Sequence, residues 1–306
     1  MSVKRRTAVI IVTYNAMKWI DICLPKLYNV DGVRLIIVDN ASPDGSSQLI
    51  KQKYPNVTLI ESKENLGFGK ANNLGLRSAL DQGFEYIFLQ NQDAAIDEKN
   101  LNRLIELAEK NPDYGIISPV HFKNDNEIEN LFATYVKKTL FEGFNLQSDK
   151  LLDADFINAA LWLLPAKTIK EIGGFNPLFS HYGEDFDYIS RVKYFGYRLG
   201  FAEGAQGFHY RDYDIKKVRE SSSGKTHFGP WHVKYYSMLT NINKPDWRVF
   251  CDTGYLFAVS LLKHAIQLNF NSIKWDFRVY AEVLKKMPYI FRENRKIIRQ
   301  KGSLFI

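Results

Sequence analysis

The segment YIFLQNQD, from Tyr86 to Asp93, carries a carboxylate at the end of an apolar run that is typical of a buried strand. Ligands of open α/β sheets bind at the carboxyl ends of the strands. One carboxylate at such an end, together with phosphate oxygens and water, is a common way to hold a divalent cation. Asp93 is therefore a candidate ligand for Mg²⁺ or Mn²⁺ in a metal diphosphate site.

Two earlier segments repeat this pattern of an apolar run that ends on polar side chains. The run AVIIVTYN ends on Thr13, Tyr14 and Asn15, and the run RLIIVDNAS carries Asp39 at its end. A carboxylate at such a strand end can accept hydrogen bonds from a base N–H or from a ribose hydroxyl. We therefore expect three strand ends to face one crevice. The alternative for Asp39 is that it makes a turn and caps the following helix.

A third group of chemically active side chains is the acidic sequence GEDFD, which holds Glu184, Asp185 and Asp187. Adjacent carboxylates raise each other's pKa, so one of them can keep the proton affinity of a general base while a neighbour pairs with Arg191. Glu184 and Asp185 point in different directions on any regular element, so only one can face a substrate. The alternative is an acidic helix N-terminus, which the helix dipole stabilises.

Strand and helix patterns alternate through the first 120 residues and position these groups on one sheet. The alternation predicts βαβ units and an α/β fold with a doubly wound, mostly parallel sheet. We expect amphipathic helices over 19–27 and 69–80, and strands at 57–62 and 114–120. Asp97 is expected to cap a helix that ends near Lys110.

The composition limits the class of protein. The chain has 306 residues, of which 45% are hydrophobic and 25% charged, and no apolar run reaches the roughly 18 residues that a membrane span needs. The apolar run near the N-terminus is too short for a signal sequence. The two cysteines, Cys23 and Cys251, exclude a disulfide framework and are expected in the core. These features predict a cytoplasmic protein that is soluble or peripheral to the membrane.

The net charge is +7. The segment from Lys285 to Lys301 contains seven Lys or Arg residues and a single acid, Glu293. An anionic membrane surface suits such a segment, and a solvated helix face is the alternative. No zinc finger or RNP signature accompanies the basic residues, so nucleic acid is not an expected partner.

The loop NLGFGKANN, from Asn65 to Asn73, begins like a dinucleotide-binding fingerprint, with Gly67 and Gly69 in place. Its third position is Asn72 instead of glycine, and the loop follows the third strand of the sheet instead of the first. NAD is therefore not an expected cofactor. The glycines still allow the backbone to approach a ligand closely.

Six motifs together carry a resemblance to a known family. VIIVTYN, LIIVDNAS, ENLGFGKANNLGL, LQNQDA, GGFNPLF and GEDFDYISR occur in the order and spacing of family 2 glycosyltransferases, over roughly residues 7–210. The chain looks most like the non-processive, rhamnosyltransferase-like members, because the Q-x-x-R-W motif of the processive members is absent. The resemblance implies a GT-A fold over 1–240, with a nucleotide-binding half at 1–120 and an acceptor-binding half at 121–240. Lys244-Pro245 and Met287-Pro288 punctuate a helical, basic appendage over 241–306.

The resemblance also implies a role for particular residues. Asp185 is implied to be the catalytic base, supported by Glu184 and Arg191, and Asp93 with His209 is implied to bind the metal. In the D-x-D motif of the family, Asn91 replaces the first acid here. The donor would contact Thr13, Tyr14, Asn15, Asp39, Asn65, Gly67, Asn72 and Asn91. The acceptor would lie against Trp162, His181 and Tyr182.

The function implied is inverting transfer of one sugar in cell-surface polysaccharide biosynthesis. The donor would be a UDP- or dTDP-linked sugar, and the acceptor a saccharide or a lipid-linked saccharide. Two alternatives stay open: a nucleotidyltransferase that makes nucleotide sugars, and an inactive carbohydrate-binding protein. The sequence TYNAMKW after the first strand does not favour the nucleotidyltransferase, which would carry a Gly-rich segment there.

Overall fold

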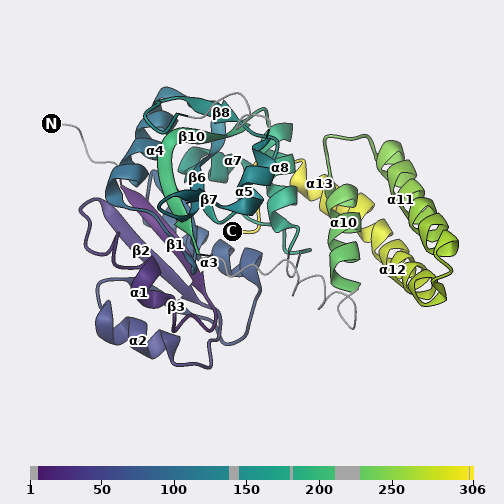
Figure 1. Ribbon diagram of the computed structural model, residues 1–306, viewed down its shortest axis with the longest axis horizontal. Coiled ribbons are helices and arrows are strands. Elements are labelled where there is room, and N and C mark those ends of the chain that lie inside the picture. Colours follow the sequence, from purple (N-terminus) through teal and green to yellow (C-terminus); the bar gives the residue numbers. More distant parts are fainter. Residues whose placement is uncertain (1–5, 138–144, 180–181, 211–227, 303) are drawn as a thin grey trace.

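A mixed sheet of ten strands forms the centre of the protein in this computed structural model, which describes residues 6–137, 145–179, 182–210, 228–302 and 304–306. Helices cover both faces of the sheet, and a group of longer helices lies to one side (Figure 1). The strand order is β3-β2-β1-β4-β9-β6-β10-β5, with β7 beside β6 and β8 beside β10. This arrangement confirms the predicted α/β fold.

The first part of the sheet consists of parallel strands. They are β1 (Thr7–Thr13), β2 (Val33–Asp39), β3 (Thr58–Glu61) and β4 (Tyr86–Asn91). β1 lies between β2 and β4 and is parallel to both, and β3 extends the sheet beyond β2. The carboxyl ends of β1, β2 and β4 therefore meet at one edge of the sheet, as the sequence predicted.

The second part of the sheet contains antiparallel strands. β9 (Leu161–Pro165) is antiparallel to β4 and to β6 (Tyr114–Asn124), and β10 (Arg198–His209) is parallel to β6. The end of β10 pairs with the short β5 (Ala94–Ala95), which follows directly after β4 and Asp93. This pairing brings His209 beside the end of β4. The remaining strands are β7 (Glu127–Ile128) and β8 (Leu151–Asp153).

The side chains of alternate residues of β1 point to opposite faces of the sheet, and the core accordingly has two layers. Ala8 and Ile10 face one layer, and Val9 and Ile11 face the other. The first layer holds α3 (Phe68–Asp81), α5 (Asn130–Tyr135), α7 (Ala166–Ile172) and α8 (Glu184–Tyr194). The second layer holds α1 (Ile20–Cys23), α2 (Ser46–Lys53) and α4 (Glu98–Lys110).

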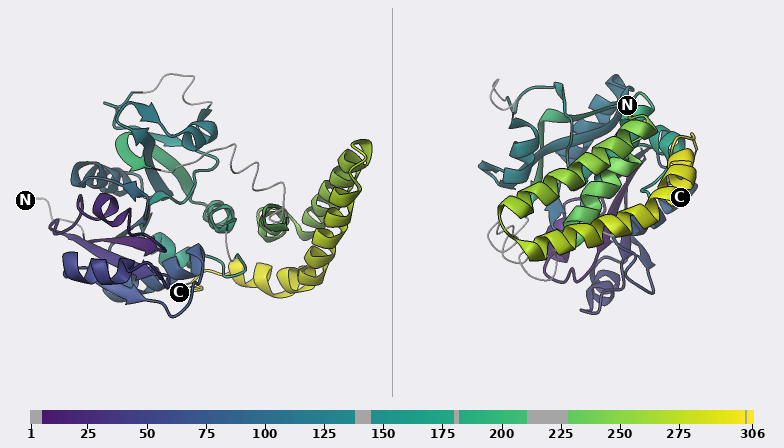
Figure 2. Two further views of the ribbon diagram at one scale, coloured as in Figure 1. Left: turned by 60° about the horizontal axis from the view of Figure 1, so that its bottom comes forward. Right: turned by 90° about the vertical axis from the view of Figure 1, so that its right-hand side faces the viewer.

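The C-terminal helices form a separate small core. They are α10 (Phe228–Thr240), α11 (Asp246–Ile266), α12 (Phe270–Tyr289), the π-helix η1 (Ile290–Asn294) and α13 (Arg295–Ile298). Leu239, Val249, Val283 and Ile290 are among its buried residues. α10 packs in this cluster although it lies before residue 241, where the appendage was expected to begin. The hairpin of α11 and α12 projects away from the sheet (Figure 2).

The helical unit is fastened to the sheet domain at several places, one of which is the buried pair of Asn176 and Asn294, whose side-chain amides hydrogen-bond to each other over 3.0 and 3.1 Å. Asn243 Nδ2 donates to the Ser190 carbonyl of α8 over 2.8 Å, and Ser190 Oγ donates to Asn241 Oδ1 over 3.2 Å. At the other end, Gly302 N donates to the Glu171 carbonyl of α7, and Gly174 N donates to the Leu304 carbonyl. The last described residues therefore lie against the sheet domain.

Several cations of the basic segment 285–301 are used inside the protein, which revises the expectation of a free basic surface. Arg295 is fully buried and donates to Asp246 and to three backbone carbonyls. Arg299 also donates to Asp246, over 2.7 Å, and Lys301 pairs with Glu171. This segment therefore closes the helical unit.

Some of the sequence predictions for single elements are confirmed and others are wrong. Asp97 caps α4, as predicted, by accepting the Asn100 amide over 2.8 Å. The helix predicted over 19–27 is reduced to α1, because turns replace its remaining residues. Pro288 does not interrupt the helix: α12 continues through it and leads into the π-helix. Cys23 is buried, but Cys251 is exposed on α11.

α11 adds a candidate for a membrane span that the search for continuous apolar runs did not find. Over its 21 residues it is long and apolar enough to span a membrane by length and composition, and it is the one such helix within the described residues. The sequence concealed this because Asp252 and Lys263 interrupt its apolar residues, so that no continuous apolar run is visible.

Candidate active site

A cleft of about 410 Å³ opens at the carboxyl ends of β1, β2 and β4. Its lining includes residues that the sequence predicted, namely Tyr14, Asn65, Gly67, Asn91, Asp93 and Tyr182. It also includes Val12, Asn40, Phe68 and Gln92, which were not predicted. The cleft therefore lies where open α/β sheets bind their ligands.

The first two strand ends are held together beneath the cleft. Thr13 Oγ1 donates to Asp39 Oδ1 over 3.1 Å, and the Ser42 amide donates to Asp39 Oδ2 over 3.0 Å. Asp39 thus makes the turn that was the alternative to a nucleoside contact, and both Thr13 and Asp39 are buried. Asn15, at the exposed end of β1, has a φ of 53°, which is uncommon for a residue other than glycine. Such backbone strain is concentrated at functional sites.

The loop after β3 is fixed to the end of β2 through two asparagines. Asn40 Nδ2 donates to Asn65 Oδ1 over 2.9 Å, and Asn40 Oδ1 accepts the Leu66 amide. Asn65 Oδ1 also accepts the Gly67 amide, and Gly67 has a φ of 78°, which glycine adopts readily. Asn72 does not belong to this loop surface. It is buried in α3 and donates to the Phe68 carbonyl, which corrects its predicted role as a donor contact.

Asp93 lines the cleft, and His209 lies close to it in the protein interior. The distance from Asp93 Oδ1 to His209 Nε2 is 3.4 Å, and the His209 ring is fully buried. A metal–ligand distance of about 2.1 Å places adjacent ligands of an octahedral ion roughly 3 Å apart, so this pair fits one divalent cation. Neither ring nitrogen of His209 makes a hydrogen bond to the described residues. A buried imidazole without hydrogen bonds is a group that a bound ion would satisfy.

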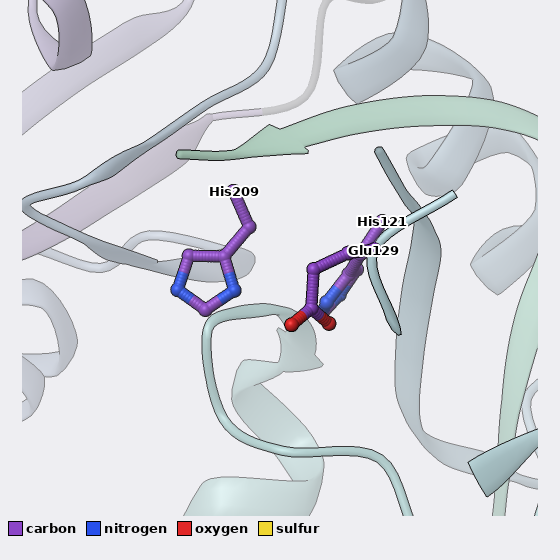
Figure 3. Close-up of side chains that lie close together, drawn as sticks. All are labelled: His121, Glu129 and His209. Atoms are coloured by element: carbon purple, nitrogen blue, oxygen red, sulfur yellow. The ribbon is translucent and has the colours of Figure 1, made fainter. Parts of the chain in front are cut away.

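A second pair of side chains lies next to His209 in the protein interior. His121, at the end of β6, and Glu129, which precedes α5, are buried, and their ligand atoms and that of His209 lie within 4.8 Å of one another (Figure 3). The sequence prediction missed both residues, because they fall in the weakly patterned region 121–152. Only the pairing of β6 with β10 brings them to His209.

The acidic sequence GEDFD forms the first turn of α8 beside the cleft. Tyr182 lines the cleft, and its backbone φ is 65°. Gly183 follows it as the N-cap, and the helix begins with Glu184 and Asp185. Glu184 is buried, and burial, together with the Asp185 charge, raises its pKa from 4.5 to about 7. Asp185 is partly exposed, and its Oδ1 accepts the Phe186 amide. The two carboxylates therefore have different environments, as acid and base groups of active sites often do.

Two predicted site residues belong to the core instead. Arg191 is fully buried and donates to Asp187 Oδ2 over 2.9 Å and to the carbonyls of Ile172 and Gly174, so it supports neither Glu184 nor Asp185. Trp162 is fully buried in β9 and stacks near Phe175, so it cannot form a wall for an acceptor. His181, the third predicted acceptor contact besides Tyr182, lies outside the described residues.

Comparison with known proteins decides the family. Residues 8–167 match the family described as Glycosyl transferase family 2. The chain belongs to glycosyl transferase family 2. This confirms the resemblance seen in the six motifs, and the matched region holds the strand ends that form the cleft, with Asp93 and the loop around Asn65.

Two relatives show which family 2 enzymes the chain is similar to. It is 22% identical over 243 residues to an N-acetylglucosaminyl-diphospho-decaprenol L-rhamnosyltransferase of Mycobacterium tuberculosis, covering 71% of this chain and 77% of that protein. It is 25% identical over 224 residues to the low-salt glycan biosynthesis hexosyltransferase Agl10 of Haloferax volcanii, covering 70% of each. This family 2 protein is accordingly similar to rhamnosyltransferases and hexosyltransferases.

Solved structures agree on the fold. The mannosyltransferase PcManGT of Pyrobaculum calidifontis, in complex with GDP-Man and Mn²⁺, is 19% identical with a TM-score of 0.54, covering 94% of this chain and 88% of that one. TarS 1–349 of S. aureus, in complex with UDP-GlcNAc, is 16% identical with a TM-score of 0.56, covering 96% and 89%. The family 2 chain therefore has the predicted GT-A fold.

Proposed function

We propose that the protein transfers one sugar, with inversion, from a nucleotide-diphosphate sugar to a lipid-linked saccharide. The observation that carries this proposal is the cleft at the ends of β1, β2 and β4, which is lined by Asp93, with His209 buried beside Asp93 and the acidic turn of α8 at the cleft margin. The lipid-linked acceptor is supported by the Mycobacterium tuberculosis relative, whose name specifies a diphospho-decaprenol acceptor.

Within this proposal, Asp93 and His209 bind the cation, which neutralises the charge of the departing diphosphate. Tyr14, Asn65 and Gly67 bind the nucleotide part of a UDP- or dTDP-linked donor in the cleft. Asn91 takes the first position of the family's metal motif and contributes an amide oxygen instead of a carboxylate. The proposed ion is Mg²⁺ or Mn²⁺, both of which accept oxygen ligands from one carboxylate and from phosphates.

Asp185 is the proposed general base. Its carboxylate takes the proton of the acceptor hydroxyl, while the hydroxyl oxygen attacks the anomeric carbon from the face opposite the diphosphate. The new C–O bond forms as the bond to the diphosphate oxygen breaks, so the configuration inverts. This role is supported by the position of Asp185 in the first turn of α8, which begins one residue beyond Gly183 and close to Tyr182 of the cleft.

A donor screen followed by product analysis tests the proposal. We expect one of UDP-, dTDP- or GDP-linked sugars to raise the melting temperature in the presence of Mn²⁺, because a ligand that binds only the folded state stabilises it. That donor should then add one sugar to a polyprenyl-diphosphate-linked N-acetylglucosamine, as seen by mass spectrometry, with inverted configuration by NMR. Donor binding without transfer to any saccharide acceptor would favour the inactive carbohydrate-binding alternative.

We also propose that the protein contacts an anionic membrane surface, and that the contact is made by the hairpin of α11 and α12. Large apolar side chains on this hairpin expose 56–75% of their surface, and an accumulation of exposed apolar side chains is typical of interaction sites. They are Trp247, Phe250, Tyr255, Leu262, Ile266, Leu268, Phe270 and Phe277. Exposed cations lie on the same hairpin, at Arg248, Lys263, Lys274 and Arg278, and complement anionic lipid.

The packing of α11 favours a helix that lies on the membrane over one that spans it. Its inner face is buried against the other helices through Val249, Thr253 and Ser260. Asp276 of α12 accepts hydrogen bonds from Ser260 Oγ, over 3.0 Å, and contacts His264 Nδ1 at 2.7 Å. Spanning would break this buried network, whereas lying in the interface leaves it intact.

Liposome flotation tests the membrane contact. Replacing Leu262 and Ile266 by Ser should strongly reduce binding to vesicles of phosphatidylethanolamine and phosphatidylglycerol while leaving donor hydrolysis unchanged. The matched control replaces Ile22 and Leu74, which are exposed apolar residues of the sheet domain, by Ser and should bind as the wild type does. Equal flotation of the hairpin variant and the wild type would contradict the proposal, as would dimers that only the hairpin variant dissociates.

A further inference from the structure

The buried pair His121 and Glu129 lies beside His209 (Figure 3), and neither residue lines the cleft. We propose that Glu129, assisted by His121, is a positioning residue that holds the proton of His209 on Nδ1 and so directs the lone pair of Nε2 toward Asp93 and a cation. This inference rests on the proposed role of Asp93 and His209 in binding Mg²⁺ or Mn²⁺. It goes beyond that role, because it assigns a function to two residues that do not reach the cleft.

The orientation of the His209 ring supports this assignment. Nε2 lies 3.4 Å from Asp93 Oδ1, whereas the ring nitrogen next to the branch carbon, Nδ1, faces Glu129 and His121 (Figure 3). A neutral imidazole carries a proton on one nitrogen and a lone pair on the other. A cation held with Asp93 requires the lone pair on Nε2, so the proton must be on Nδ1.

Glu129 is fixed in a position to stabilise that proton. Its backbone amide donates to the His121 carbonyl over 2.8 Å, and its Oε2 accepts the Phe132 amide over 2.7 Å as the N-cap of α5. One carboxylate oxygen is thus used by the helix, and the other can accept a proton from a neighbour. Histidines that bind metals almost always donate their second ring N–H to such a carboxylate, carbonyl or water.

The tautomer of His121 follows from a hydrogen-bond chain and agrees with this role. Ser118 Oγ donates to the Pro119 carbonyl over 3.0 Å, so at its 2.9 Å contact with His121 it accepts the proton of Nε2. His121 therefore carries its lone pair on Nδ1 and is a second acceptor beside His209. Two acceptors, Glu129 and His121, then lie near His209, with one ligand atom of each of the three residues within 4.8 Å of the others.

Glu129→Gln separates positioning from helix capping. The amide oxygen of Gln can still accept the Phe132 amide, so the cap of α5 and the melting temperature should be retained. The amide nitrogen would then face His209, and two donors cannot share one proton position, so His209 would move its proton to Nε2. We expect the affinity for Mn²⁺, measured by electron paramagnetic resonance with Mn²⁺ alone and with Mn²⁺ and UDP, to fall about 10- to 100-fold.

Two further variants complete the design. Glu127→Gln removes an exposed carboxylate from β7, two residues away, and should bind Mn²⁺ as the wild type does. Glu129→Ala loses the cap as well and should lower both the melting temperature and the Mn²⁺ affinity. If Glu129→Gln binds Mn²⁺ as tightly as the wild type, Glu129 only caps α5 and the inference is wrong, while the proposed cation site stands.

Two other results would also overturn the inference. If the wild type does not bind Mn²⁺ with or without UDP, the inference fails together with the proposed cation site. If the protein as purified holds one tightly bound zinc ion that Glu129→Gln and His121→Asn both release, these residues are themselves ligands of a buried metal. Metal analysis of the purified protein and of both variants distinguishes that result from the positioning role.

Discussion

The side chain of Gln92 hydrogen-bonds to both the amide and the carbonyl of Tyr14, as the backbone of a neighbouring strand would. Its Oε1 accepts the Tyr14 amide over 2.8 Å, and its Nε2 donates to the Tyr14 carbonyl over 3.2 Å. Gln92 lies between Asn91 and Asp93, so the cation motif after β4 and the nucleoside-side residues after β1 are joined by one side chain.

We therefore predict that Gln92→Ala weakens donor binding by about tenfold. The loss of hydrogen bonds that are worth about 1 kcal/mol lets the end of β1 move relative to Asp93. Titration calorimetry with UDP and Mn²⁺ measures this change. Gln82→Ala, which removes a glutamine that bonds only within its own exposed helix end, is the control. Unchanged affinity in Gln92→Ala would show that the cleft does not depend on this link.

Asp185→Asn should retain the fold and nucleotide affinity but lose transfer by a factor of about 10² to 10⁴, which is the usual contribution of a general base. Glu184→Gln should be milder. Steady-state rates at saturating donor, together with the dissociation constant for UDP, provide the measurement. Transfer at the wild-type rate in Asp185→Asn, with a large loss in Glu184→Gln, would move the base to the buried carboxylate.

Asp93→Ala should abolish transfer and the Mn²⁺-dependent part of donor binding together, because the ion loses its carboxylate ligand. Asn91→Ala should have a smaller effect, since an amide oxygen carries no net charge. Donor affinity measured with Mn²⁺ and with chelator compares the two variants. Full activity in chelator, with Asp93→Ala near the wild-type rate, would show that protein cations neutralise the diphosphate.

The stability of the protein should fall between pH 4.5 and 7 because of Glu184. Its pKa is raised to about 7 in the folded state, so in this window the folded protein keeps a proton that the unfolded chain has released. The unfolded state then binds fewer protons, and the free energy of unfolding decreases as pH rises. A shift of this size corresponds to a contribution on the order of 3 kcal/mol.

Glu184→Gln removes this titration, so its melting temperature should exceed that of the wild type more at pH 8 than at pH 5. Calorimetry at both pH values measures the difference between variant and wild type. Glu106→Gln, at an exposed position of α4, should show no such pH-dependent difference. An equal difference at both pH values would mean that Glu184 is ionised in the folded state throughout.

Arg191→Met should lower the free energy of unfolding by about 3 to 5 kcal/mol, because it leaves the buried Asp187 carboxylate without its cation. Urea denaturation measures this loss. Arg198→Met, which breaks ion pairs on the surface, should cost about 1 kcal/mol or less. Lost activity with unchanged stability in Arg191→Met would restore the role at the site that the sequence suggested.

The sequence predicted those features that depend on neighbours along the chain. Apolar runs that end on Tyr14 and Asp93 define the strand ends of the cleft, and each run shows this by itself. The prediction that Trp162 contacts the acceptor was wrong, because an aromatic residue of a strand gives the same sequence pattern whether its face of the sheet is exposed or covered. Only the packing of β9 against Phe175 decides which of these holds.

Features that depend on the tertiary pairing of distant segments could not be read from the sequence. Glu129 and His121 reach His209 only because β6 and β10 are neighbours in the sheet. In the same way, the buried position of Arg295 depends on the carbonyl of Leu239 at the end of α10 and on that of Asn241 just after it. The sequence therefore suggested an exposed basic surface in that region, although Arg295 is buried and has a structural role.

The attachment of the helical unit at several places restricts the orientation of the whole enzyme. A part held at one point can rotate, but this unit is held by Asn243 on α8, by Asn294 on Asn176 and by Leu304 near α7, so it cannot turn independently of the sheet domain. If the hairpin rests on a bilayer, the opening of the cleft is kept at a constant height and tilt above the headgroups. The length of the acceptor's headgroup would then act as a ruler, which admits carriers that reach that height and excludes shorter or longer ones.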